Sequence, residues 1–129
     1  MLSTKHTIFT AHAPAPIGPY SQAVMAGNML FVSGQIAMTP ETNEMVTDDI
    51  KEEAQQVMLN IGTILKAADL HYHNIVKTSI FLKDMNNFAA VNEVYGHFFS
   101  SEFPARETVE VSRLPKDVNV EISVIALKD

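Results

Sequence analysis

The strongest constraint on the fold lies in the C-terminal segment 104–127, where apolar and polar residues alternate. Every second position of its last part is apolar, which predicts a strand with one apolar face: Val118, Val120, Ile122, Val124 and Ala126. The opposite face carries Asn119, Glu121 and Ser123 before it becomes apolar at Ile125 and Leu127. A carboxylate therefore occupies the middle of a strand, on a face that is partly apolar.

The residues before Pro115 predict a partner strand, folded back on the last one around a proline turn. If the turn consists of residues 114–117, Arg106 lies opposite Ile125 and Glu110 opposite Glu121, all on one face. The backbones of Arg106 and Glu121 are then roughly 13 Å apart at ~3.3 Å per residue. The pattern leaves open whether a site that uses both side chains takes them from one subunit or from two.

Changes of hydrophobic period predict the other elements. Strands are expected at residues 6–10, at 21–25 and 29–34 as a hairpin, and at 75–82. Helices are expected at 49–68, behind an Asp49-x-x-Glu52 capping box, and from Phe88 to near Ser100. The expected fold class is α+β: one domain over residues 1–129, with a mixed, mostly antiparallel sheet and two helices on one face. Two helices cover only one face of the sheet, yet several strands are apolar on both faces. The uncovered face therefore predicts self-association, and a dimer is the commonest form.

Composition excludes several classes of function. The 9 basic and 15 acidic residues give a net charge of −6, so nucleic acid is not an expected partner. The chain has no cysteine, which excludes disulfides, zinc–thiolate sites and thiol nucleophiles. No apolar run approaches the ~20 residues of a membrane span, and the first six residues lack the apolar core of a signal peptide. A cytoplasmic protein without a membrane partner is the expectation.

Six segments, in collinear order from Ala13 to Ala126, together resemble the RidA (YjgF) family of reactive-intermediate deaminases. They are Ile-Gly-Pro-Tyr-Ser-Gln at 17–22, Asn-Met-Leu-Phe-Val-Ser-Gly-Gln at 28–35, the strand 76–84, Asn-Glu-Val-Tyr at 92–95, Pro-Ala-Arg at 104–106 and Arg-Leu-Pro-Lys-Asp-Val-Asn-Val-Glu-Ile at 113–122. The resemblance implies a chorismate-mutase-like fold and a homotrimer with a central barrel and intersubunit sites, in place of the dimer. It also implies hydrolysis of 2-imino acids or enamines, such as 2-aminoacrylate, 2-iminopropanoate and 2-iminobutanoate, to 2-oxo acids and ammonia, without a cofactor.

The resemblance assigns roles to individual residues of this chain. Arg106 is expected to bind the substrate carboxylate, and Glu121 to orient or activate water. The other expected substrate-binding residues are Tyr20, Ser33, Gly34, Asn92 and Thr108. Thr108 replaces a cysteine of some relatives, and Glu107 replaces a common serine, so a negative charge adjoins Arg106. Strict alternation predicts that Glu107 points to the other side of the sheet.

The residue pattern alone allows plainer interpretations. Arg106 could pair with Glu107 or Glu110, and Glu121 could be a solvated strand carboxylate. His71-x-His73 is weak evidence for a metal site, and no metal is expected. Two rival functions also remain: a regulatory trimer that senses 2-oxo acids without turnover, and a chaperone-like interaction protein that uses apolar patches.

Overall fold

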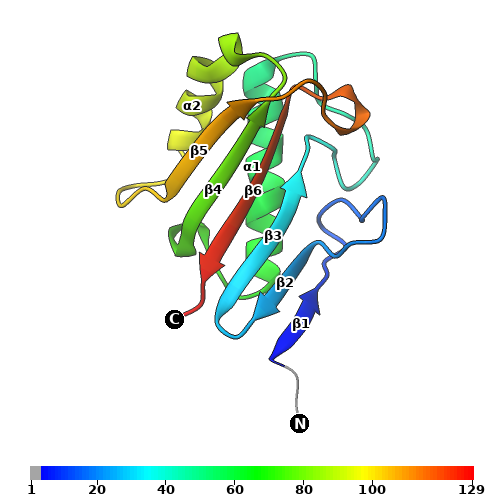
Figure 1. The fold of residues 1–129 in the computed structure, drawn as a ribbon. Coiled ribbons are helices and arrows are strands. Elements are labelled where there is room, and N and C mark those ends of the chain that lie inside the picture. Colours follow the sequence, from blue (N-terminus) through cyan, green and yellow to red (C-terminus); the bar gives the residue numbers. More distant parts are fainter. Residues whose placement is uncertain (1–3) are drawn as a thin grey trace.

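The structure, a computed structural model, describes residues 4–129 and contains one six-stranded sheet (Figure 1). The strand order is β1-β2-β3-β6-β4-β5, and all neighbouring strands are antiparallel except β4 and β5. The strands are β1 Lys5–Ile8, β2 Ala23–Ala26, β3 Met29–Gln35, β4 Ile75–Leu82, β5 Ala105–Glu110 and β6 Val120–Leu127. Helices α1 (Ile50–Ala67) and α2 (Phe88–Gly96) lie on the same side of the sheet. This arrangement confirms the expected α+β class and the mostly antiparallel mixed sheet.

Three single turns of 3-10 helix connect these elements: η1 Tyr72–Asn74, η2 Met85–Asn87 and η3 Pro115–Asp117. No helix within residues 4–129 is long and apolar enough to cross a membrane. The expectation of no signal peptide rests partly on Met1, Leu2 and Ser3, which lie outside the described residues.

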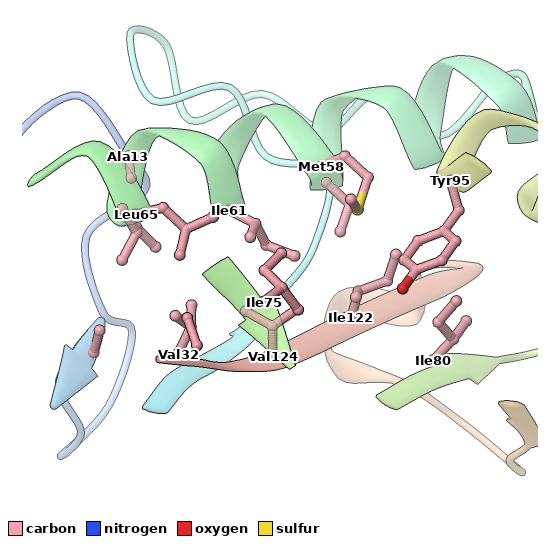
Figure 2. Close-up of a cluster of buried hydrophobic side chains, with 14 of the residues drawn as sticks. Ala13, Val32, Met58, Ile61, Leu65, Ile75, Ile80, Tyr95, Ile122 and Val124 are labelled. Carbon is pink, nitrogen blue, oxygen red and sulfur yellow. The ribbon is translucent and has the colours of Figure 1, made fainter. Parts of the chain in front are cut away.

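The core forms between α1 and the sheet. Helix α1 begins where expected, because the Asp49 carboxylate accepts a hydrogen bond from Glu52 N at 3.1 Å. Figure 2 shows side chains of α1 facing side chains of the central strands, all of them fully or almost fully buried: Met58, Ile61 and Leu65 on the helix, and Val32, Ile75, Ile122 and Val124 on the strands. The helical spacing of the apolar residues therefore predicts the buried face correctly.

Helix α2 is shorter than expected: it ends at Gly96 rather than near Ser100. The apolar residues beyond it, Phe98 and Phe99, pack against Tyr72, with ring centres 5.0 and 6.4 Å apart. Their spacing thus reflects a separate aromatic contact rather than continued helix.

The expected C-terminal hairpin is wrong. Strand β5 runs parallel to β4, with Arg106 beside Thr78, whereas β6 lies between β3 and β4, with Glu121 beside Phe81. The segment between β5 and β6 crosses the end of β4, where Val111 N donates to Leu82 O at 2.8 Å and Lys83 N donates to Asn119 O at 3.0 Å. A strand with apolar residues on both faces, such as β6, occupies the centre of a sheet rather than one side of an edge hairpin.

This topology separates Arg106 and Glu121, the two predicted catalytic residues. Paired residues of neighbouring strands share a face, so Arg106 lies on the helix side with the fully buried Thr78. Glu121 lies on the opposite face, together with Phe81. The prediction that Arg106 and Glu121 share one face is therefore wrong. The prediction for Glu107 is confirmed, since it turns away from Arg106 and pairs with Lys77 at 2.9 Å.

No helix of residues 4–129 covers the face that carries Glu121 (Figure 1). Two large apolar side chains on this face are substantially exposed, Phe31 at 46% and Val109 at 41%. An uncovered sheet face with such residues is typical of a surface that associates with another chain.

Candidate functional site

The first part of the candidate site is an arginine held against helix α2. Arg106 Nη1 donates a hydrogen bond to Asn92 Oδ1 at 2.6 Å. The guanidinium carbon lies 5.2 Å from the centre of the Tyr95 ring and 5.7 Å from that of Phe88. These cation–π contacts fix the plane of the guanidinium while most of its N–H groups stay available.

Arg106 has no acidic partner within residues 4–129. Glu107 binds Lys77 and Ser79 on the other face, and Glu110 accepts a hydrogen bond from Met85 N at 2.7 Å. The plainer interpretation, in which Arg106 forms a local salt bridge with one of these acids, is therefore wrong.

Arg106 lines a cavity of about 460 Å³. Its other lining residues are Asn92, Tyr95, Gly96, Phe103 and Pro104. The Tyr95 hydroxyl donates a hydrogen bond to Thr78 Oγ1 at 2.8 Å, which holds the ring in place as one wall of the cavity. Burial raises the pKa of this hydroxyl. A guanidinium that is free of carboxylates and held against aromatic rings can bind a substrate carboxylate through two parallel hydrogen bonds. This half of the site is hereafter the arginine cavity.

The second part of the candidate site is a cavity of about 350 Å³ on the opposite sheet face, hereafter the acid cavity. It brings together four of the predicted residues with three others: Tyr20, Ser33, Gly34 and Glu121, and Ile17, Ile36 and Pro115. The Ser33 hydroxyl donates to Ser21 O at 2.6 Å, while the Tyr20 hydroxyl accepts from Ile17 N at 3.2 Å. The Tyr20 O–H is therefore available to donate to a ligand.

Gly34 makes room for the Glu121 carboxylate. A Cβ atom at position 34 would lie 2.8 Å from Glu121 Cδ, closer than real side chains approach one another. The pairing of β3 with β6 is irregular between Val32 and Gln35, and Gly34 lies within this irregular step. A side chain at position 34 would therefore displace the Glu121 carboxylate.

The Glu121 carboxylate is only partly solvated. Burial raises its pKa, and the carboxylate has no hydrogen-bonding partner within residues 4–129. A carboxyl group with a raised pKa and free oxygens is suited to take a proton from water and return it.

The structure separates the predicted site residues into two groups and leaves one apart. Asn92 joins Arg106 in the arginine cavity, and the other group lines the acid cavity. Thr108 lies two residues from Arg106 on the same strand face, but its hydroxyl is buried without a hydrogen-bond partner among residues 4–129 and does not line either cavity. The sequence reasoning missed Tyr95 and Phe88 as contacts of Arg106. Their signal was spacing, since Asn92, Tyr95 and Phe88 recur at three and four residues on one helix face.

His71, His73 and His97 line a further cavity of about 510 Å³ beside the aromatic residues that follow α2. The rings of His71 and His73 stack with centres 5.6 Å apart. In the part of the chain that the structure describes, no three His, Asp or Glu side chains are arranged to hold a metal ion.

Comparison with known proteins identifies the family and supports the fold. The family model described as endoribonuclease L-PSP matches residues 10–128. The chain belongs to this family, which is also called RidA. Members of the RidA family with high similarity include a RutC family protein of Pyrococcus horikoshii, 54% identical over 97% of this chain and 99% of the relative.

Two further RidA family members extend this comparison. A Dermatophagoides farinae protein named 2-iminobutanoate/2-iminopropanoate deaminase is 48% identical over 98% of each chain. The crystal structure of the YjgF gene product from E. coli has a TM-score of 0.92 and 49% identity, and the match covers 96% of this chain and 99% of that one.

Proposed function

We propose that this protein hydrolyses 2-imino acids, or their enamine tautomers, to 2-oxo acids and ammonia. The observation that carries the proposal is a pair of complementary half-sites: among residues 4–129, the Arg106 guanidinium has no acidic partner and the half-buried Glu121 carboxylate has no hydrogen bond. The name of the D. farinae relative supports 2-iminopropanoate and 2-iminobutanoate as substrates. Both are small carboxylates that suit cavities of about 350–460 Å³.

The proposed working unit is a homotrimer in which each site forms between two subunits. Within one chain the arginine and acid cavities lie on opposite faces of the sheet, so one small substrate cannot contact Arg106 and Glu121 of the same chain. In a closed ring, the arginine cavity of one subunit can face the acid cavity of the next. The exposed Phe31 and Val109 on the uncovered sheet face support burial against neighbouring copies.

In the proposed mechanism, Arg106 of one subunit binds the substrate carboxylate and thereby orients the protonated imine. Glu121 of the neighbour takes a proton from water as the water oxygen bonds to the imine carbon, and the C=N π electrons move to nitrogen. Glu121 then gives this proton to the nitrogen of the tetrahedral intermediate. The C–N bond breaks, the carbonyl forms, and the hydroxyl proton goes to the departing ammonia. A protonated imine is already electrophilic, so the reaction requires no metal or organic cofactor.

Each rival function conflicts with a particular feature. A sensor of 2-oxo acids needs Arg106 but gains nothing from a half-buried acid that has no hydrogen bond within residues 4–129. An endoribonuclease, as in the family description, needs cationic surface for phosphates, whereas this chain has a net charge of −6. A chaperone-like protein needs apolar patches that stay exposed, whereas the proposed trimer buries the uncovered sheet face.

Ammonia release from freshly generated 2-aminoacrylate tests the proposal. Arg106→Ala is expected to lower kcat/KM about 10²-fold or more, because the lost hydrogen bonds are charge-assisted. The variant should remain trimeric by light scattering, since Arg106 forms no ion pair within residues 4–129 whose loss would disturb the fold. Near-normal turnover by Arg106→Ala, or binding of pyruvate by a wild-type protein that releases no ammonia, would contradict the proposal.

A further inference from the structure

Glu53 is a fully buried acid on α1 that contacts β6 at its start. Its Oε2 accepts hydrogen bonds from Asn119 N at 2.7 Å and from Val120 N at 3.2 Å. Its Oε1 accepts from Asn119 Nδ2 at 2.7 Å. All three donors belong to two consecutive residues that lie 66 and 67 positions away in the chain.

These two residues immediately precede Glu121. The segment from Pro115 to Glu121 contributes both of its ends to the acid cavity, and Asn119 lies between them. On one side, Asn119 O accepts from Lys83 N next to β4. On the other side, pairing of β6 with β3 ends at Ile122, so strand β3 does not reach Asn119 or Val120. Glu53 supplies the acceptors that a strand would otherwise provide.

Burying a carboxylate without a cationic partner costs free energy of folding. An uncharged acceptor could bond the same N–H groups at the start of the strand without that cost. Within residues 4–129, Glu53 forms no ion pair. Its short, charge-assisted hydrogen bonds instead give one backbone segment a well-defined position. That segment carries the acid that must aim a water molecule.

We infer that Glu53 is a positioning residue for Glu121: by fixing Asn119 and Val120, it holds the Glu121 carboxylate against Gly34 in the acid cavity. This inference rests on the proposed function. Without Glu53, the start of β6 can shift and Glu121 becomes better solvated and less well aimed. Arg106 lies on another strand and on the other sheet face, so binding of the substrate carboxylate does not depend on Glu53.

The test compares Glu53→Ala with Glu53→Gln. Glutamine can keep its oxygen on the two backbone N–H groups and donate its amide to Asn119 after that side chain flips. Glu53→Ala should lower kcat on the order of 10²-fold, as small misplacements of catalytic groups do, while KM stays within about twofold. Glu53→Gln should recover most of kcat.

The control is Asp49→Ala, which removes the cap of the same helix without touching β6. It should lower the thermal midpoint and leave kcat of the folded protein unchanged. A second readout is the NMR titration of the Glu121 carboxyl carbon, whose midpoint should move toward that of an ordinary glutamate in Glu53→Ala and stay in place in Asp49→Ala.

The outcomes separate the inference from the proposed function. If Glu53→Ala lowers only the thermal midpoint, with kcat and the Glu121 titration unchanged, Glu53 is a structural anchor and the inference is overturned. If the wild type releases no ammonia, the proposed function fails, and the Glu121 titration alone then decides whether Glu53 positions this carboxylate.

Discussion

The environment of the Glu121 side chain determines how the carboxyl group in the acid cavity responds to pH. Burial disfavours its charged form and raises its pKa, and no cation or hydrogen bond within residues 4–129 offsets this effect. A general base must be ionised, so activity should fall as the pH drops through this raised pKa. The acid limb of the kcat/KM profile should therefore lie above the titration range of an ordinary glutamate. A limb at or below that range would contradict the proposed role.

The same burial predicts an effect of Glu121→Gln on stability. A raised pKa in the folded state means that the folded protein binds the proton more tightly than the unfolded chain. The contribution of Glu121 to the free energy of unfolding therefore declines as the pH rises from the unfolded pKa through the folded one. Glu121→Gln should raise the thermal midpoint at neutral pH, leave it nearly unchanged at acidic pH, and abolish ammonia release. A lower midpoint at neutral pH would show that the carboxylate is stabilising.

Among the secondary-structure elements, β3 and β6 supply the contact between Gly34 and Glu121 in the acid cavity, beside the irregular pairing between Val32 and Gln35. Gly34→Ala should push the Glu121 carboxylate out of place and lower kcat by about tenfold or more, with a smaller effect on stability. Gly62→Ala is the matched control, because its Cβ would lie 2.6 Å from Tyr72 Cζ, in the contact between α1 and η1. It should lower the thermal midpoint and spare kcat of the folded protein. Equal losses of kcat in both variants would refute a specific role for Gly34.

The strands and helices show which parts of the fold can be predicted from the sequence. The hydrophobic pattern predicts that the six strands and the two α-helices exist, although α2 ends earlier than predicted, and alternation correctly turns Glu107 away from Arg106. Alternation specifies faces along one strand but not which strand lies beside it, so the partner of β5 was predicted wrongly. The apolar residues on both faces of β6 indicated a central strand, a signal that outweighs the nearby proline turn. The site residues came from the family resemblance, and their division between two faces depends on the parallel pairing of β4 and β5.

In the whole molecule, the arginine cavity and the acid cavity lie far apart, on opposite faces of the sheet. Arg106 and Glu121 stand two strands apart and three residues apart in register, so their Cα atoms are roughly 14 Å apart at ~4.8 Å per strand and ~3.3 Å per residue. The sheet itself lies between their side chains. If both side chains act on one substrate, as proposed, each subunit offers two partial sites that a neighbouring copy must complete.

Mixing two inactive variants tests this arrangement directly. Arg106→Ala and Glu121→Gln subunits are mixed in equal amounts and allowed to exchange at random between trimers. In a site between two subunits, Arg106 is then intact in half of the cases and Glu121 is independently intact in half. About a quarter of the sites should therefore regain activity. A site within one chain would regain none. The control mixes wild type with the double variant: about a quarter of the sites should be active if they form between subunits, and about half if each chain carries its own. Turnover in the first mixture that stays at the level of the separate variants, after mass spectrometry has confirmed exchange, would exclude the intersubunit site.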